Sequence, residues 1–409
     1  MANLAVKGGA PLLKGKKWGG RWPVVGKPDE EALLRVLHSG KWCRGTYPEA
    51  SQSEVGKFEQ KFARYHDAKH GVCVTNGTAA LELAYRAGGI GLGDEVICPS
   101  ATFVATSTAA NNIGGVPVFV DIDPETYDIL PEAVERAVTK KTKAIAPVHL
   151  GGYPCDMDAL CAIGKKHGLF LVEDCSHAHG SEWKGRKVGA IGDMGTFSFQ
   201  MGKTLTSGEG GIVLTDSEKL AEKLYSLHNI GRIKDRPFYE FHVIAWNLRM
   251  TEFQGALLSA QFERFDEQIE HREELATHFA EELEKIPGVR ATKRDPRVTR
   301  WGFYYYTFKF ISKEFEGVTR DQFLKAVRAE GAPINAGGHI QPLYHNPVYK
   351  ESRASYRAEP CPNCEYAWKE EALSIGHSIF LGPKQDIDDI LAAIRKVRAN
   401  TDELRELAG

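Results

Sequence analysis

The sequence predicts an α/β fold, in which a large domain with a mostly parallel mixed sheet flanked by helices is followed by a smaller α+β domain. Two observations lead to this prediction. From about residue 70, short apolar runs alternate with helix-forming stretches, which is the pattern of βαβ units. After about residue 250 this alternation ends, and a long charged amphipathic stretch precedes the β-rich run "RWGFYYYTFKF".

The elements follow this pattern along the chain. One helix, "PDEEALLRVLHSG", is expected near the start. In the large domain, strands are expected at 70–75, 94–100, 116–123, 142–150, 169–176, 195–200 and 210–216, and helices at 77–91, 102–115, 130–140 and 157–168. One long helix over 252–287, a strand over 300–310 and helices over 319–330 and 384–408 follow.

The chain is therefore divided into three parts. Residues 1–60 form an N-terminal segment that we expect to pack on the large domain. Residues 61–250 form the large domain, and residues 251–409 contribute the long connecting helix and the C-terminal domain.

Composition excludes several classes of protein. With 42% apolar and 26% charged residues, the chain is typical of a soluble globular protein. A formal net charge of -2 without a basic stripe argues against a nucleic-acid partner. No apolar run approaches the ~18 residues of a membrane span, and the first residues lack the apolar core of a signal peptide. We therefore expect a cytoplasmic protein that neither spans a membrane nor binds nucleic acid.

The eight cysteines do not predict a metal site. Cys361 and Cys364 form a single "CPNC" pair, whereas a structural zinc site usually needs a second pair of ligands. We expect no metal in this protein.

In open parallel sheets, ligands bind beyond the carboxyl ends of the strands. The first expected strand ends in "TNGTAALELA", where small polar residues open into a helix. Free backbone N–H groups and the helix dipole make such a terminus an anion site, with Gly77 allowing close approach and Thr78 adding a hydroxyl. An ordinary helix N-cap would look the same.

A carboxylate ends the apolar strand in "LFLVEDCSHAH". Asp174 follows apolar residues, and His177 and His179 come soon after it. Three interpretations remain open: a metal site, a structural hydrogen-bonded cluster, or a carboxylate that holds a proton on a heterocyclic nitrogen.

A single lysine occupies the glycine- and hydroxyl-rich segment "TFSFQMGKTLTSGEGG". Lys203 is either a solvated charge or a nucleophile for Schiff-base chemistry. Ser198 precedes it by five residues and could donate to a phosphate, and Phe103 in "PSATFVATS" could stack on a ring. An anion cradle, a strand-end aspartate and a later lysine, in this order, fit pyridoxal 5′-phosphate (PLP).

The sequence resembles the sugar aminotransferase family called DegT/DnrJ/EryC1/StrS, of PLP fold type I. The resemblance extends from about residue 20 to the C-terminus. It rests on "TNGTAALELA", "PSATFVATS", "VEDCSHAHG", "TFSFQMGKTLTSGEGG", "WNLRMTEFQGALL" and "GHIQPLYH".

The resemblance implies roles for individual residues. Lys203 would bond covalently to PLP and later move a proton, Asp174 would pair with the pyridinium nitrogen, and His177 would contact the ring hydroxyl. The other implied cofactor contacts are Gly77, Thr78 and Ser198 at the phosphate, Phe103 on the ring, and Asn247, which reaches the phosphate of the neighbouring subunit. A homodimer with shared active sites follows.

The resemblance also implies substrate contacts. Arg249 would receive the carboxylate of the donor or form a structural ion pair, and His339 and Tyr344 belong to the acceptor motif. That motif reads "HIQPLY" here, so Ile340 and Tyr344 depart from its usual His-Tyr-x-Pro-Leu-His form, and Thr204 replaces the common asparagine after the lysine.

The family implies a ping-pong transfer of an amino group from glutamate or glutamine to a keto-sugar or keto-cyclitol. The patterns "FSFQ-x-GK" and "CPN-x-E" resemble the branch of inosose aminotransferases and 3-amino-5-hydroxybenzoate synthases. A PLP-dependent dehydratase and aromatase, or an aminotransferase for nucleotide-linked keto-sugars, are the alternatives. A PLP-binding regulatory protein would need a DNA-binding module, which the sequence does not contain.

Overall fold

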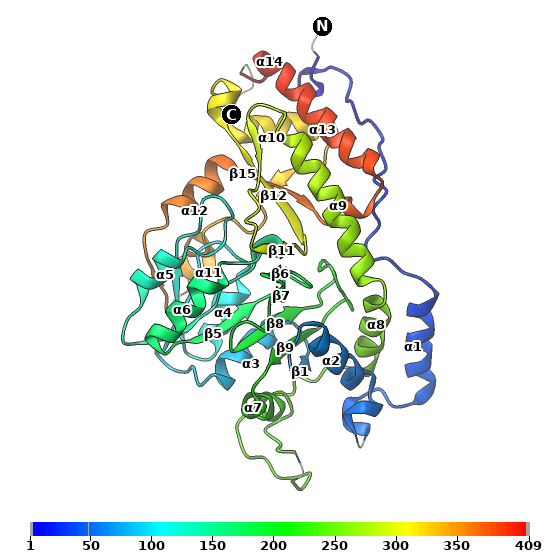
Figure 1. Cartoon of the computed structure of the whole chain (residues 1–409), viewed down its shortest axis with the longest axis vertical. Helices are drawn as coiled ribbons and strands as arrows, with labels where there is room; N and C mark the ends of the chain where they lie inside the picture. Colours follow the sequence, from blue (N-terminus) through cyan, green and yellow to red (C-terminus); the bar gives the residue numbers. More distant parts are fainter. Residues whose placement is uncertain (1–2, 48, 235, 353, 406–409) are drawn as a thin grey trace.

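The computed structural model describes residues 3–47, 49–234, 236–352 and 354–405. Figure 1 shows a broad lower part that holds the large sheet and an upper part formed mainly by the C-terminal third of the chain. Helix α9 (Phe265–Leu283) runs from one part to the other. Within the described ranges, every helix is too short or too polar to cross a bilayer.

Eight strands form the large sheet, in the order β1-β9-β8-β5-β4-β2-β3-β14. Their bounds are β1 His70–Val74, β2 Glu95–Pro99, β3 Val116–Val120, β4 Thr142–Ile145, β5 Phe170–Asp174, β8 Met194–Ser198, β9 Gly211–Thr215 and β14 Arg357–Ala358. β9 pairs antiparallel with both β1 and β8, and the remaining neighbours pair in parallel. The predicted mostly parallel mixed sheet is confirmed.

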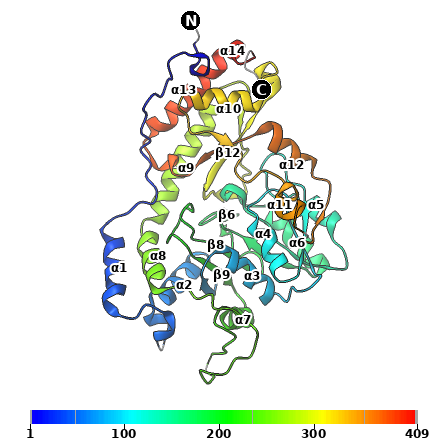
Figure 2. The same ribbon diagram turned by 180° about the vertical axis from the view of Figure 1, so that it is seen from behind.

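Helices cover both faces of this sheet. They are α2 Glu54–Tyr65, α3 Gly77–Ala87, α4 Ala105–Asn112, α5 Pro131–Ala137, α6 Met157–His167 and α7 Glu218–His228. Alternate residues of a strand point to opposite faces, so Val96 and Cys98 of β2 pack with α3 and α4, whereas Ile97 packs with α5 and α6. Figure 2 shows α3 and α4 in front of the sheet when the molecule is seen from behind.

The C-terminal part contains a second, antiparallel sheet in the order β10-β12-β15-β13. Its strands are β10 Val289–Ala291, β12 Tyr305–Phe310, β13 Asn335–Ala336 and β15 Ala372–Gly376, and the helices around it are α9, α10 Arg320–Ala329, α13 Lys384–Ala399 and α14 Thr401–Arg405. A small third sheet joins β11 Val298–Arg300 to β6 Glu182–Trp183 and β7 Arg186–Lys187, and short helices α11 Pro347–Lys350 and α12 Pro362–Tyr366 flank the large sheet.

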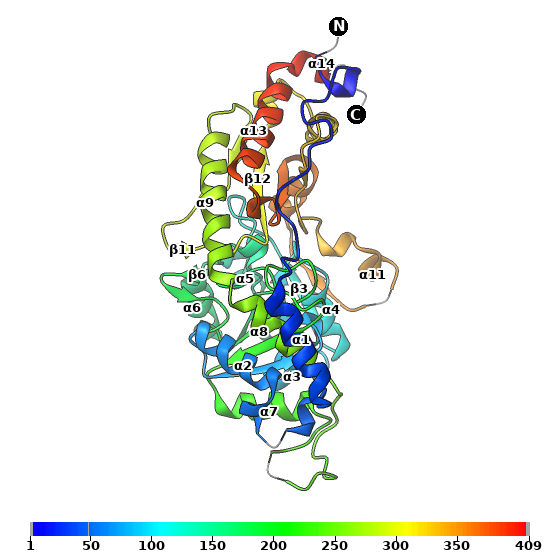
Figure 3. The ribbon, with the colours of Figure 1, turned by 90° about the vertical axis from the view of Figure 1, so that its right-hand side faces the viewer.

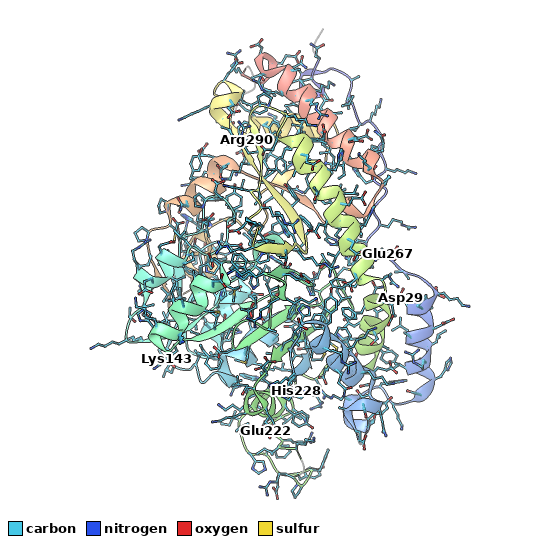
Figure 4. All side chains as sticks on the ribbon, viewed as in Figure 1. Asp29, Lys143, Glu222, His228, Glu267 and Arg290 are labelled. Atoms are coloured by element: carbon cyan, nitrogen blue, oxygen red, sulfur yellow. The ribbon has the colours of Figure 1, made fainter. Side chains whose placement is uncertain are left out.

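The single long helix expected over 252–287 is wrong, because the structure contains two helices there. α8 (Glu252–Phe262) ends before Arg264, whose backbone leaves the helical region at the start of α9. The Arg264 side chain donates to both carboxylate oxygens of Asp29, which Figure 4 labels beside α8, and to the Val24 carbonyl. The residue at the break between α8 and α9 is thus held by the N-terminal segment. The hydrophobic periodicity of residues 252–287 gives no sign of this contact.

The N-terminal segment lies partly elsewhere than expected. Figure 3 shows it descending along the C-terminal part before it reaches α1 (Lys27–Ser39), which lies beside α8. Leu4 is buried in the core that contains α13, and Leu13 donates its N–H to the Glu330 carbonyl at 2.9 Å. α2, at 54–65, packs directly on β1 of the large sheet. The three-part division of the chain stays a prediction.

Candidate active site

A cavity of about 830 Å³ lies where the carboxyl ends of β5 and β8 face the C-terminal part. Eight of the predicted site residues line it: Gly77, Thr78, Phe103, Asp174, His177, Ser198, Lys203 and His339. They come from the first turn of α3, the loop after β2, the ends of β5 and β8, the loops after these two strands, and the C-terminal part. The structure therefore brings together residues that are separated by up to 262 positions in the sequence (77 to 339).

The N-terminus of α3 forms one wall. Asn76 is the N-cap, and its side-chain oxygen accepts the Ala79 N–H at 2.8 Å. A Cβ on Gly77 would lie 2.6 Å from Cβ of Ser198, so only glycine lets the first turn of α3 approach the end of β8 this closely. Backbone N–H groups, the Thr78 side chain and the Ser198 hydroxyl thus share one wall of the cavity, as an anion cradle requires.

Asp174 ends β5 at the floor of the cavity and is only 4% exposed. Its carboxylate accepts two hydrogen bonds, one from the Thr106 hydroxyl at 2.7 Å and one from the Ser176 N–H at 3.1 Å. Both partners act as donors, which suits an ionised carboxylate. Asp174 can therefore stabilise a proton on a ring nitrogen placed in the cavity.

Lys203 is buried in the same cavity, with 8% of its surface exposed. Burial lowers the pKa of its amine to about 8, although the Asp174 carboxylate opposes this shift. Nζ lies 4.3 Å from the centre of the Tyr304 ring. This burial contradicts the interpretation of Lys203 as a solvated charge, and its role as a nucleophile stays a prediction.

The rings of Tyr304, His177 and His339 form a stack beside Lys203. The His177 ring lies 4.3 Å from the Tyr304 ring and 5.3 Å from the His339 ring, with interplanar angles of 19° and 16°. Burial, followed by the charge of Lys203, lowers the pKa of His177 well below its usual range and the pKa of His339 to about 4. Both imidazoles are therefore neutral at physiological pH. Nδ1 of His177 is buried and has no hydrogen-bond partner among the described residues.

Phe103 stands beside this stack, with its ring 5.7 Å from that of His339 in an edge-to-face arrangement. It is 51% exposed although it lines the cavity, so a flat ring bound there would cover apolar surface.

His179 supports the lysine loop from behind. One ring nitrogen bonds the Ser198 carbonyl at 2.9 Å, and the Thr204 hydroxyl lies 3.5 Å from the other. Among the described residues, the side chains whose possible metal-ligand atoms lie close together are those of His149, Glu173 and Cys175. Asp174, His177 and His179 do not form such a group. The structure thus favours a hydrogen-bonding role for His179 over the metal interpretation.

Two members of this group, His149 and Glu173, are hydrogen-bonded. Glu173 accepts the N–H groups of Gly189, Ile191 and Gly192 together with a bond from His149, whose other ring nitrogen accepts the Cys155 N–H. Glu173 therefore ties the segment between β7 and β8 to β5 of the large sheet. The two thiols of "CPNC" are buried, and each donates to a backbone carbonyl.

Three predicted site residues lie outside the cavity of the described chain. Asn247 is exposed and pairs through its backbone with Asn229, and the Arg249 guanidinium donates to the Asn229 side chain at 2.9 Å. The Tyr344 hydroxyl donates to Glu365 at 2.9 Å. Their roles in cofactor or substrate binding stay predictions.

The sequence prediction of the site omits Tyr304 and Trp246, which line the cavity, and Thr106, which does not line it but donates its hydroxyl to Asp174. Tyr304 lies in the strand expected over 300–310, to which the sequence assigns no role in the site. The aromatic run that contains Tyr304 was a usable signal. The contact between Thr106 and Asp174 was not, because these residues belong to different βα units.

A buried lysine, a strand-end carboxylate and a helix N-terminus that share one cavity of an α/β fold define a PLP-dependent enzyme. The chain belongs to the DegT/DnrJ/EryC1/StrS aminotransferase family, whose sequence pattern matches residues 24–395.

Known proteins resemble the chain over nearly its whole length. An L-glutamine:2-deoxy-scyllo-inosose aminotransferase of Micromonospora echinospora is 37% identical, covering 99% of this chain and 100% of that protein. A 3-amino-5-hydroxybenzoate synthase of Amycolatopsis mediterranei is 38% identical, covering 90% and 94%. A crystal structure of 3-amino-5-hydroxybenzoic acid synthase matches with a TM-score of 0.85 at 35% identity, covering 94% of this chain and 100% of that chain.

These findings confirm the predicted family, fold class, enzyme class and cofactor. The protein is a PLP-dependent aminotransferase. The residues present also fit the cofactor. The Gly77 cradle leaves room that a Cβ would fill, a buried amine and a carboxylate face the same cavity, and His177 offers an unpaired ring nitrogen.

Proposed function

We propose that this protein transfers the amino group of L-glutamine or L-glutamate to the ketone of a polyhydroxylated carbocycle of the scyllo-inosose type, in a ping-pong sequence. The observation that carries the proposal is the Lys203 amine, which is buried in one cavity with the Asp174 carboxylate and an anion cradle. Relatives named as L-glutamine:scyllo-inosose and 2-deoxy-scyllo-inosose aminotransferases, 35% and 37% identical, support this donor and acceptor.

The cofactor contacts follow from the walls of the cavity. Gly77, Thr78 and Ser198 would hold the phosphate of PLP at the N-terminus of α3, where the helix dipole favours an anion. Asp174 would face the pyridinium nitrogen, and Phe103 would cover one face of the ring. His177 would use its free Nδ1 toward the ring hydroxyl.

Lys203 carries the acid–base chemistry. Bound PLP supplies an electron sink that makes the α-hydrogen of the donor amino acid acidic. Nζ of Lys203 takes this proton and returns it to complete the transfer, and on the acceptor it acts in the opposite direction. With a pKa near 8, the amine can serve both as base and as acid at physiological pH.

The acceptor would lie against the ring stack. His339 and Tyr304 line the same cavity, and His339 is kept neutral by burial, so it can exchange hydrogen bonds with hydroxyl groups without attracting an anion. Tyr344, which bonds Glu365, would shape the wall behind this region.

We further propose a homodimer in which each subunit contributes to the active site of the other. The segment 233–246 exposes large apolar side chains, with Phe238 at 66%, Tyr239 at 83% and Ile244 at 92%. Several large apolar side chains exposed within one short segment are typical of a protein interface. Asn247 and Arg249 directly follow this segment and lie outside the cavity of their own chain, so they would serve the partner's phosphate and donor carboxylate.

A cytoplasmic location is part of the proposal. All eight cysteines carry free thiols, as expected in a reducing compartment.

A second function has specific support. The 3-amino-5-hydroxybenzoate synthase relative is 38% identical, and the matching synthase structure has a TM-score of 0.85. A PLP-dependent dehydration that forms an aromatic ring is therefore the alternative, and a nucleotide-linked keto-sugar acceptor is a third possibility to include in the assay.

The test separates the two half-reactions. PLP-loaded protein is mixed with L-glutamine or L-glutamate, and absorbance follows conversion of the cofactor to its amino form. The converted protein is then offered scyllo-inosose, 2-deoxy-scyllo-inosose or a nucleotide-linked keto-sugar, and mass spectrometry detects the amino product. Conversion by glutamine with amination of an inosose supports the proposal, whereas an aromatic product favours the alternative. Conversion with none of these ketones as acceptor would overturn the cyclitol assignment.

A further inference from the structure

A buried arginine, Arg272, lies behind the lysine loop and has no acidic partner in the described part of the chain. Arg272 on α9 has no exposed surface, and its Nε and Nη1 have no hydrogen-bond partner among the described residues. Buried charges are usually paired, so this guanidinium needs a separate explanation. The guanidinium makes a hydrogen bond through Nη2 to Nδ1 of His377, at 3.4 Å.

His377 connects the arginine to the lysine loop. Its Nε2 lies 3.0 Å from the carbonyl oxygen of Gly202, the residue immediately before Lys203. A guanidinium can only donate and a carbonyl can only accept. Nδ1 of His377 must therefore carry the lone pair and Nε2 the proton, so its two partners together select a single neutral tautomer.

A third side chain completes the arrangement. The Trp22 indole donates to the Met201 carbonyl at 2.7 Å, and its ring lies 4.7 Å from the His377 ring and 5.5 Å from Cζ of Arg272. The carbonyls of the two residues before Lys203 are thus held by Trp22 and His377. The lysine N–H in turn donates to the Gln200 carbonyl at 2.8 Å.

An anion-binding role for Arg272 does not fit. Its guanidinium lines neither the 830 Å³ cavity nor the neighbouring 320 Å³ cavity, which His377 does line. A donor carboxylate would have to displace His377 to reach it. Burial lowers the pKa of Arg272 to about 9, which still leaves it protonated and able to donate at pH 7.

We propose that Arg272 is a positioning residue for Lys203: it fixes the Nε2–H tautomer of His377, which holds the backbone of the lysine loop through the Gly202 carbonyl. This inference rests on the proposed role of Lys203. The charged or titratable groups around His377 are Arg272, Lys203, His179 and Tyr304. Burial and the charge of Arg272 keep the pKa of His377 well below its usual range, so the arrangement is independent of pH near neutrality.

The test compares three variants with the wild-type protein. Arg272→Met removes the donor, whereas Arg272→Gln keeps an N–H donor without the charge. Arg320→Met is the matched control, because Arg320 is a buried arginine on α10 that bonds Trp368 and Asp321, away from the lysine loop.

Two measurements on the protein without cofactor test whether Arg272 positions His377 and the lysine loop. Ring ¹⁵N shifts report the tautomer of His377 between pH 5 and 8, with His377→Gln used to assign its signals. Hydrogen exchange reports the opening of residues 200–208. We expect the Nε2–H form at every pH in the wild-type and Arg272→Gln proteins. In Arg272→Met we expect a mixed or protonated imidazole and exchange in 200–208 about tenfold faster, as for the loss of one hydrogen bond. Arg320→Met should change neither.

Several outcomes would overturn the proposal. Finding the Nδ1–H tautomer in the wild-type protein would do so even if Arg272→Met failed to fold. Unchanged His377 shifts and unchanged exchange at 200–208 in a folded Arg272→Met protein would do so as well. Borohydride reduction with peptide mapping tests separately whether PLP is carried by Lys203, so failure of the proposed function is distinguishable from failure of this inference.

Discussion

Replacement of Lys203 by methionine should stabilise the protein when PLP is absent. Burial lowers the pKa of the amine from 10.5 to about 8, which means that the folded state disfavours the ammonium form. One pKa unit corresponds to about 1.4 kcal/mol, so the penalty of holding this charge is on the order of 3 kcal/mol at pH 7. Methionine has a similar length and no charge, so it removes this penalty while keeping an apolar chain beside the Tyr304 ring.

The lowered pKa of Lys203 also determines how the stability difference between the two proteins changes with pH. Between pH 8 and 10.5 the unfolded chain binds more protons at this lysine than the folded chain, so the stability of the wild-type protein rises with pH in this window. The penalty is complete below about pH 8 and absent above about 10.5. We therefore expect Lys203→Met to raise the free energy of unfolding by about 2–3 kcal/mol at pH 7, allowing for the cation–π contact with Tyr304, and by almost nothing above pH 10.5.

Guanidinium chloride unfolding followed by tryptophan fluorescence measures the difference, at fixed protein concentration and without cofactor. Lys165→Met serves as the control, because Lys165 is an exposed lysine on α6 and its replacement should change stability by no more than about 0.5 kcal/mol. A Lys203→Met protein that is less stable than wild type at pH 7, or whose advantage does not shrink with rising pH, would refute the assignment of a buried, destabilised amine.

Three further predictions concern the active site. Gly77→Ala brings a methyl carbon within 2.6 Å of the serine that ends β8, so PLP affinity should fall by about tenfold or more in an absorbance titration, while Gly91→Ala, with open space around it, should bind normally. Asp174→Asn should still bind PLP but slow α-proton removal from glutamine by orders of magnitude in stopped-flow absorbance; a near-normal rate would contradict its role at the ring nitrogen. Co-expression of Lys203→Ala with Asn247→Asp should restore activity in isolated mixed dimers above that of either parent, and its absence would contradict shared active sites.

Much of the fold was predictable because the strands of the large sheet are buried on both faces. Each strand reads as a short apolar run, and glycine or a polar turn separates it from the following helix, so βαβ units stand out without knowledge of their contacts. The break between α8 and α9 was not predictable. Arg264 continues an amphipathic pattern, and the reason that the helix stops there is Asp29, more than 200 residues earlier in the chain. Local sequence cannot record a boundary that a distant side chain imposes.

The active site shows the same limit at the level of single residues. Lys203 and Asp174 were predictable because each is chemically out of place in its own segment: an amine among glycines and hydroxyls, and a carboxylate at the end of an apolar strand. Arg272 and His377 are ordinary in their segments, and only tertiary contacts connect them to the lysine loop. Lys203 and Asp174 are thus visible in sequence, whereas the residues that surround the lysine loop become visible only when the C-terminal part folds over the large sheet. Changes in this second group should alter the rate and the pH dependence of the reaction before they alter which reaction occurs.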